Sequence, residues 1–121
     1  MSAVLLGAYK KFVSGKINQN LVGIYQDIID FNTNGDNTIA TPPDSGRKLR
    51  LHLIMFLVGG VTNIRFKSGA TSKTGLMPFA ANQGIILSGD EIQLEMVAGD
   101  SFIINSSNAV QIGGLINFSY E

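Results

Sequence analysis

The fold is decided by residues 48–67, which run Lys48-Leu49-Arg50-Leu51-His52-Leu53-Ile54-Met55-Phe56-Leu57-Val58-Gly59-Gly60-Val61-Thr62-Asn63-Ile64-Arg65-Phe66-Lys67. Polar and apolar residues alternate one for one up to Leu53, and the alternation resumes over residues 64–67. A period of two is typical of a half-buried β-strand. The Gly59-Gly60 pair between the two runs is typical of a two-residue hairpin turn. We therefore predict a long β-hairpin on which the rest of the chain packs.

The alternation fails from Leu53 to Phe56, where four large apolar residues follow one another. An unbroken apolar run in a strand predicts that both of its faces are covered. We expect the core to cover one face and a sister subunit to cover the other, with His52 at the rim of that contact. His52, Ile54 and Phe56 are therefore candidate assembly contacts.

Length and charge limit the classes of function. A chain of 121 residues forms one domain with one core. Nine basic residues balance nine acidic ones, and only 15% of residues are charged, against about 25% in typical proteins. Such a surface creates little long-range electric field, so we expect neither nucleic acid nor a membrane as partner.

The chain contains no cysteine, which excludes disulfides and thiolate metal sites. No apolar run approaches the roughly 18 residues of a membrane-spanning segment. The first residues carry no basic charge before their short apolar run, so they make a poor signal peptide.

Residues 1–20 differ in composition from the rest, and we predict that they form an N-terminal arm or a short helix outside a single β-sandwich domain of residues 21–121. Residues 5, 9, 12 and 13 would share one face of an amphipathic helix. Gly7 and Gly15 weaken a helix, and an extended arm fits equally well. In either form the segment could cover its own domain or reach a partner.

Short apolar segments with turn residues between them fill the remainder of the chain. Further strands are expected over residues 21–31, 38–40, 76–80, 85–87, 91–97 and 101–105, and residues 110–112 lead through Gly113-Gly114 into a last strand over 115–120. Pro78 places its strand at a sheet edge, and the alternation over 91–97 points Ile92, Leu94 and Met96 inward. About eight or nine short strands at this spacing predict an all-β, antiparallel, jelly-roll-like β-sandwich.

Residues that carry enzyme chemistry are scarce. His52 is the one histidine, and a general base there would need a nucleophile and an orienting acid, neither of which the sequence supplies. Metal sites fail on ligand count, and the turn at 32–37 has its glycine at the wrong position for a calcium loop. The carboxylates at positions 90, 91, 95 and 100 are expected in turns or on a solvated face. We therefore expect no catalytic, cofactor-binding or metal-binding residues and no enzyme.

Four short motifs follow one another along the second half of the chain, each occurring once. They are Arg65-Phe66-Lys67-Ser68-Gly69-Ala70-Thr71, then Thr74-Gly75-Leu76-Met77-Pro78-Phe79-Ala80-Ala81-Asn82-Gln83-Gly84, then Ala98-Gly99-Asp100-Ser101, and last Ala109-Val110-Gln111-Ile112-Gly113-Gly114-Leu115-Ile116-Asn117-Phe118. Over about residues 36–120 this pattern resembles small tailed-bacteriophage virion proteins. The resemblance implies a jelly-roll-like β-sandwich on the phage head, either a decoration (cement) protein or the base of a head fibre. It supplies no catalytic residue.

We accordingly expect a non-enzymatic virion structural protein, made in the host cytoplasm and located on the capsid surface. Its expected partners are the major capsid protein and itself, as a homotrimer, because closed cyclic oligomers suit the symmetry axes of a shell. The expected capsid or subunit contacts in the arm are Val4, Leu5, Leu6, Tyr9 and Phe12. The alternative is a glycan- or receptor-binding module of a phage fibre, although tryptophan is absent and the tyrosines are scattered.

Overall fold

The computed structural model describes residues 4–13, 16–89 and 91–121, with side chains from Gly23 onward. These residues form eleven β-strands and no helix. The strands are β1 (Val4–Val13), β2 (Lys16–Phe31), β3 (Gly35–Ala40), β4 (Leu49–Val58), β5 (Thr62–Ser68), β6 (Thr71–Ser72), β7 (Met77–Phe79), β8 (Gly84–Ser88), β9 (Leu94–Glu95), β10 (Phe102–Ser106) and β11 (Ile112–Tyr120). All pairings are antiparallel, so the predicted all-β class is confirmed.

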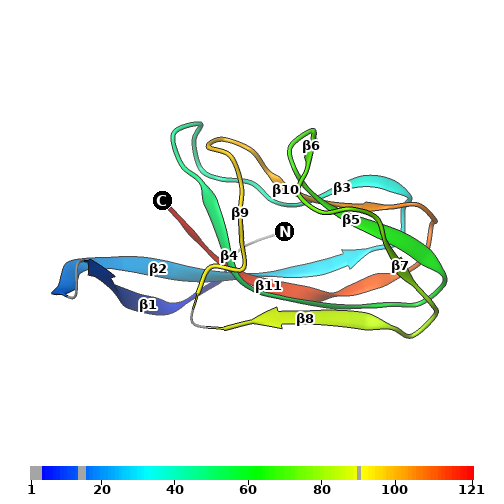
Figure 1. The fold of residues 1–121 in the computed structure, drawn as a ribbon, viewed down its shortest axis with the longest axis horizontal. Coiled ribbons are helices and arrows are strands. Elements are labelled where there is room, and N and C mark those ends of the chain that lie inside the picture. The colour runs from blue at the N-terminus through cyan, green and yellow to red at the C-terminus, as the bar shows by residue number, and fades with distance from the viewer. Residues whose placement is uncertain (1–3, 14–15, 90) are drawn as a thin grey trace.

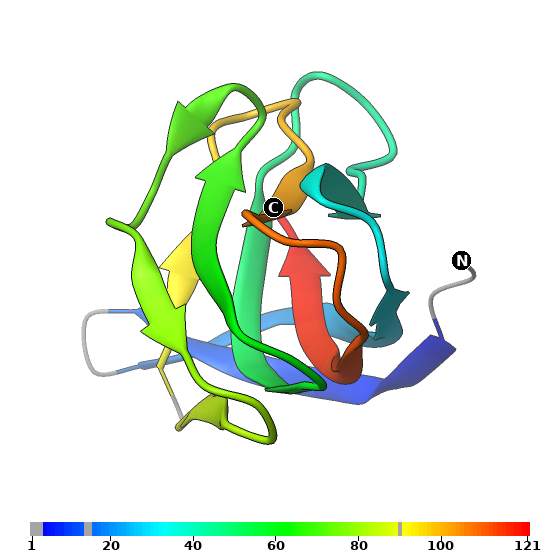
Figure 2. The same cartoon turned by 90° about the vertical axis from the view of Figure 1, so that its right-hand side faces the viewer.

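Two sheets pack face to face as a β-sandwich (Figure 1). The larger sheet has the order β1-β2-β11-β4-β8, with β9 also paired to β4. The smaller has the order β3-β10-β5-β6, with β7 also paired to β5. From β2 onward the chain passes repeatedly from one sheet to the other, as Figure 2 shows from the end. This order, with each sheet built from strands distant in sequence, is that of a jelly roll, as expected.

The predicted hairpin of residues 48–67 is wrong. Strand β4 lies in the larger sheet between β11 and β8, whereas β5 lies in the smaller sheet. The Gly59-Gly60 turn carries the chain across the sandwich, and the Gly59 amide donates to the Gln111 carbonyl at 2.7 Å. The crossing buries the inward side chains of both strands against each other, and the rings of Phe56 and Phe66 meet edge to face with centroids 6.1 Å apart. Alternation predicts strands but not their partners.

The broken alternation in β4 has a local cause, a β-bulge at His52. Leu51 pairs with Phe118 and Leu53 with Asn117, so the register steps over His52. The extra residue shifts the inward phase of the strand by one. Inward side chains are therefore Leu49 and Leu51 before the bulge and Ile54, Phe56 and Val58 after it, all of them buried. Outward positions after the bulge are also apolar, which explains the run of large apolar residues.

Aromatic side chains fill much of the core. Phe66 contacts Phe56 and Phe102, and Phe56 also contacts Phe79, with ring centroids 5.5–6.1 Å apart. A second group joins Tyr25, Phe118 and Tyr120 along the larger sheet, with centroids 5.3–5.9 Å apart. Burial, followed by the neighbouring Tyr25 and Asp27, raises the pKa of Tyr120 above its ordinary value. The core thus draws on side chains from both sheets.

Two further predictions of strand position have different outcomes. Strand β7, which contains Pro78, pairs only with β5 among the described strands, so the predicted edge position is confirmed. In the segment 91–97 only Leu94–Glu95 form a strand, and Ile92 is exposed while Met96 is buried. The prediction that Ile92 points inward is therefore wrong. Only two residues of the segment pair with a neighbouring strand, and without such pairing the segment does not keep a regular alternation.

At the N-terminus, β1 and β2 pair as an extended antiparallel hairpin, so Val4–Val13 adopt the extended alternative and not the helix. Strand β2 runs through the boundary expected between residues 20 and 21. Strand β11 pairs with β2 only from Tyr25 to Phe31, so the first part of β2 extends past β11 (Figure 1). The side chains of Val4, Leu5, Leu6, Tyr9 and Phe12 lie outside the described residues, and their contact roles stay predictions.

Candidate functional site

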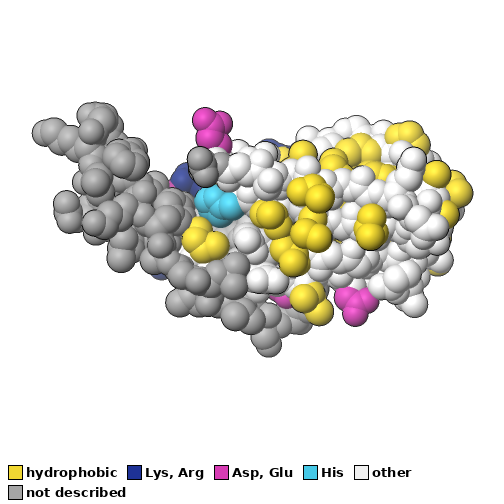
Figure 3. Space-filling model, turned by 90° about the horizontal axis from the view of Figure 1, so that it is seen from below, with side chains coloured by type: hydrophobic (Ala, Val, Ile, Leu, Met, Phe, Trp, Pro, Cys, Tyr) yellow, Lys and Arg dark blue, Asp and Glu magenta, His cyan; other side chains and the backbone are white. Residues whose placement is uncertain are grey.

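The outer side of the larger sheet carries a row of apolar side chains that crosses four strands. Ile28 of β2, Leu115 of β11, Met55 of β4 and Ile86 of β8 are direct register partners, one strand after another. Leu53 and Leu57 lie on the same side of β4. We call these six residues the apolar face. Figure 3 shows hydrophobic side chains gathered in the middle of this side of the molecule.

Four of these six side chains are exposed, which is unusual for large apolar residues, and Leu53 and Leu115 are half-buried. Ile28, Leu57 and Ile86 have 51%, 63% and 68% of their surface exposed. Scattered apolar residues are normal on a protein surface, but a contiguous group marks an interaction site. The sequence contains a sign of it, since each contributing strand has adjacent apolar residues: Ile28-Ile29, Leu53 to Val58, Ile85-Ile86-Leu87 and Leu115-Ile116. In a strand, neighbours point to opposite faces, so such doublets place one apolar side chain outside.

A shallow hollow of about 500 Å³ lies within the apolar face, lined by Met55, Phe56, Leu57, Gly84, Ile85, Ile86 and Gly113. Gly113 and Gly84 are the register partners of Leu57 on its two sides. Neither glycine has a side chain; Leu57 lies over Gly84, where a Cβ would come within 2.7 Å of Leu57 Cδ2, and the surface on the Gly113 side is open. The apolar face therefore has both a protrusion and a depression.

The outer side of the smaller sheet is polar by contrast. Lys67 Nζ lies 2.8 Å from Asp36 Oδ2, and Asn105 Nδ2 donates to Asp36 Oδ1 at 2.7 Å. These two hydrogen bonds, in that order, hold the pKa of Asp36 below its ordinary value. The two outer sides thus differ in chemistry, and the larger sheet carries the candidate interaction surface.

His52 lies beside the apolar face, at its border (Figure 3). Its Nε2 atom is 2.8 Å from Ser119 Oγ. Burial, followed by the charge of Arg50, lowers the pKa of His52, which favours the neutral imidazole. A serine next to a neutral histidine is the arrangement of a nucleophile and its base, but Ser119 is 0% exposed and out of reach of a substrate. We therefore interpret the pair as a structural contact that holds the bulge.

The candidate contacts Ile54 and Phe56 require a correction. They are 0% and 2% exposed and lie in the core between the sheets, so neither can contact a partner in this conformation. The bulge at His52 is the reason, since it shifts these two residues to the inner phase of β4. Their neighbours Met55 and Leu57 face outward in their place. An unbroken alternation counted from Leu49 would have placed Met55 and Leu57 inward, so the sequence did not reveal this.

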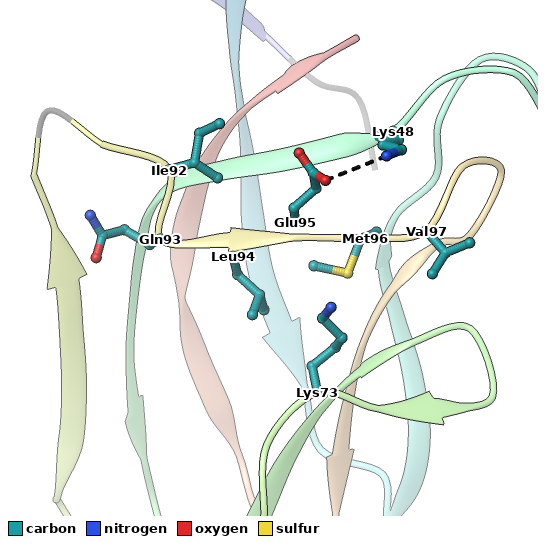
Figure 4. Close-up of a pocket in the computed structure, with 8 residues that line it drawn as sticks. All are labelled: Lys48, Lys73, Ile92, Gln93, Leu94, Glu95, Met96 and Val97. Atoms are coloured by element: carbon teal, nitrogen blue, oxygen red, sulfur yellow. Dashed lines mark ion pairs between the residues drawn. The ribbon is translucent and has the colours of Figure 1, made fainter.

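A second hollow of about 410 Å³ lies between the β9 segment and the loop after β6, lined by Lys48, Lys73, Ile92, Gln93, Leu94, Glu95, Met96 and Val97 (Figure 4). Glu95, expected on a solvated face, has a side chain that is 38% exposed and pairs with two cations: Oε2 lies 2.6 Å from Arg50 Nε, and Oε1 lies 3.6 Å from Lys48 Nζ. Arg50 also pairs with Glu121. Neither an aromatic ring for a sugar nor a second carboxylate for glycoside hydrolysis lines this hollow.

Within residues 4–13, 16–89 and 91–121, no group of three or more His, Cys, Asp or Glu residues is arranged to hold a metal ion. The same part of the chain contains no helix long and apolar enough to cross a membrane. No family model matches the sequence, and searches of curated proteins and of solved structures gave no match.

Proposed function

We propose that this protein is a non-enzymatic structural protein of a bacteriophage virion, which binds the exterior of the head and stabilises it. The observation that carries the proposal is the apolar face, a row of exposed apolar side chains that spans one sheet of a jelly roll. A surface of this kind is suited to a protein that works within an assembly, packed against other chains or against its own copies. Among the described residues, His52 and Ser119 resemble a base and its nucleophile, but the hydroxyl of Ser119 is buried and inaccessible to a substrate.

The resemblance to small tailed-phage virion proteins supplies the biological setting. Its motifs fall at defined places in the fold: Phe66-Lys67-Ser68 end β5, with Gly69 directly after it, and Val110-Gln111 directly precede β11, which begins with Ile112-Gly113-Gly114. The low fraction of charged residues suits a molecule surrounded by neighbours in a lattice. On this proposal the protein is made in the host cytoplasm and its shell partner is the major capsid protein.

For attachment to the shell we propose the N-terminal hairpin. It is the part of the larger sheet that extends past β11, since β11 pairs with β2 only from Tyr25 onward. The apolar residues Val4, Leu5, Leu6, Tyr9 and Phe12 of β1 are the proposed contacts. Removal of residues 1–20 takes away β1 and its pairing with β2 but leaves every pairing between β2 and β11, so we expect the truncated chain to retain the sandwich.

The experiment mixes purified protein with heads that lack it, prepared from the phage whose genome carries its gene, and measures co-sedimentation. The full chain is expected to pellet with the heads and to raise their resistance to heat. The chain without residues 1–20 is expected to keep its β-sheet circular dichroism and to stay in the supernatant. A full chain that never pellets would sink the proposed function, and a truncated chain that pellets equally would sink only the role of the hairpin.

A further inference from the structure

We infer that the apolar face binds a second copy of this chain, sheet against sheet about a twofold axis, in place of the homotrimer expected from the sequence. The inference rests on the proposed function as an assembly protein and names the partner of its apolar face. A twofold contact uses the same patch on both copies, so that patch must be complementary to itself. Charge, shape and hydrogen-bonding groups each bear on this requirement.

Among the described side chains, charge is nearly absent from the apolar face and from the rows of register partners on either side of it. Three rows of register partners cover this part of the sheet: Gln26-Asn117-Leu53-Ser88, Ile28-Leu115-Met55-Ile86 and Asp30-Gly113-Leu57-Gly84. Asp30 is the one charged residue among them, and it accepts a hydrogen bond from Gln111 Nε2 at 2.7 Å. A partner with a charged surface would find no opposite charges to pair with here. An uncharged apolar patch, by contrast, does not repel its own copy.

The apolar face carries a protrusion and a hollow side by side, as a self-complementary surface requires. Leu57 protrudes between Gly113 and Gly84, and the hollow of about 500 Å³ lies next to it on the same patch. A twofold axis placed midway between Leu57 and the hollow would bring the Leu57 of each copy over the hollow of the other. Each protruding side chain would then fill a depression lined by apolar groups, which is how the cores of protein interfaces pack.

The polar row beside Leu53 also fits its own copy. Gln26 carries an amide and Ser88 carries a hydroxyl, whereas the Asn117 amide oxygen is buried and cannot reach a second copy. The Gln26 amide and the Ser88 hydroxyl each both donate and accept hydrogen bonds. Groups of this kind pair with identical groups, whereas a row of carboxylates or ammonium groups would repel its own copy.

The size of the patch sets the strength of the contact. From the usual spacing of strands and of residues along a strand, these three rows cover roughly 400 Å² on each copy. Two such patches bury about 800 Å² together, less than the ~1,200 Å² at which stable interfaces begin. We therefore expect a weak pair that is monomeric at a few micromolar and dimeric at hundreds of micromolar, or where copies are crowded on a surface.

The test is sedimentation velocity of the full chain from about 1 to about 500 μM, compared with two variants. Leu57→Asp places a charge at the centre of the apolar face and is expected to stay monomeric throughout. Leu76→Asp is the matched control, since Leu76 is similarly exposed, at 54%, and precedes β7 of the smaller sheet. It is expected to dimerise like the wild type. Circular dichroism establishes that both variants fold.

A wild-type chain that remains monomeric over the whole range would overturn the inference, as would a trimer, because three copies cannot share one twofold patch. Equal loss of dimer in both variants would also overturn it. The head-binding assay separates this inference from the proposed function. If the chain binds heads but never dimerises, the proposed function holds and this inference is wrong. If the chain dimerises but never binds heads, this inference holds and the proposed function is wrong.

Discussion

At the scale of single residues, the burial of His52 determines how the fold responds to acid. Burial and the nearby Arg50 lower the pKa of His52 in the folded state below its ordinary value of 6.5. The unfolded chain therefore binds a proton more readily than the folded one. Stability from this residue is fully present above about pH 6.5 and is lost as the pH falls below it.

The first prediction is that the wild-type chain loses stability between about pH 7 and pH 5, and that His52→Gln loses less over the same interval. Glutamine keeps an amide near Ser119 but does not titrate. His52 is the only histidine in the chain, so the difference between the two proteins isolates its protonation. Urea unfolding at half-unit steps of pH measures both. Parallel pH curves for the two proteins would show that the pKa of His52 is not lowered by folding.

At the scale of elements, the bulge in β4 determines which side chains face the core. His52 is the extra residue in the register with β11. Without it, Leu49, Leu51, Ile54, Phe56 and Val58 would occupy every second position of a regular strand. Removal of His52 therefore regularises the strand, whereas removal of a residue elsewhere in β4 would invert one part of the strand relative to the other.

The second prediction follows from that register. Deletion of His52 should leave a folded sandwich that is destabilised by about 1 kcal/mol, the usual net worth of one hydrogen bond, here that to Ser119. Deletion of Met55 should unfold the protein, because the buried residues on one side of the deletion would turn outward. Thermal unfolding of both variants, followed by circular dichroism, compares them. A ranking in the opposite order would be incompatible with the bulge.

At the scale of the whole molecule, the two sheets are held together by side chains that meet across the core. Phe56 from the larger sheet packs on Phe66 and Phe79 from the smaller, and it is 2% exposed. Its neighbour Leu57 points the other way and is 63% exposed. Adjacent residues of one strand thus serve different purposes, one for the fold and one for the apolar face.

The third prediction compares these two neighbours. Phe56→Ala should lower the free energy of unfolding by about 3–5 kcal/mol, as expected for a large aromatic removed from a core. Leu57→Ala should change the free energy of unfolding by about 0.5 kcal/mol or less, as exposed positions usually do. Urea unfolding at a few micromolar, where the chain is expected to be monomeric, measures both. Equal costs would contradict the orientation of β4.

Local chemistry in the sequence was enough for the all-β class, most of the strands, the edge position of Pro78 and the scarcity of candidate catalytic side chains. These follow from alternation, turn residues and proline geometry, which act over a few neighbouring residues. Tertiary structure alone decided that β4 and β5 lie in different sheets, that His52 forms a bulge, and that Met55 and Leu57 face outward in place of Ile54 and Phe56. Those outcomes depend on which distant strands pair and on which side chains fill the space between the sheets. The two-residue alternation of a strand is the same whichever strand it pairs with, so it carries no information on these choices.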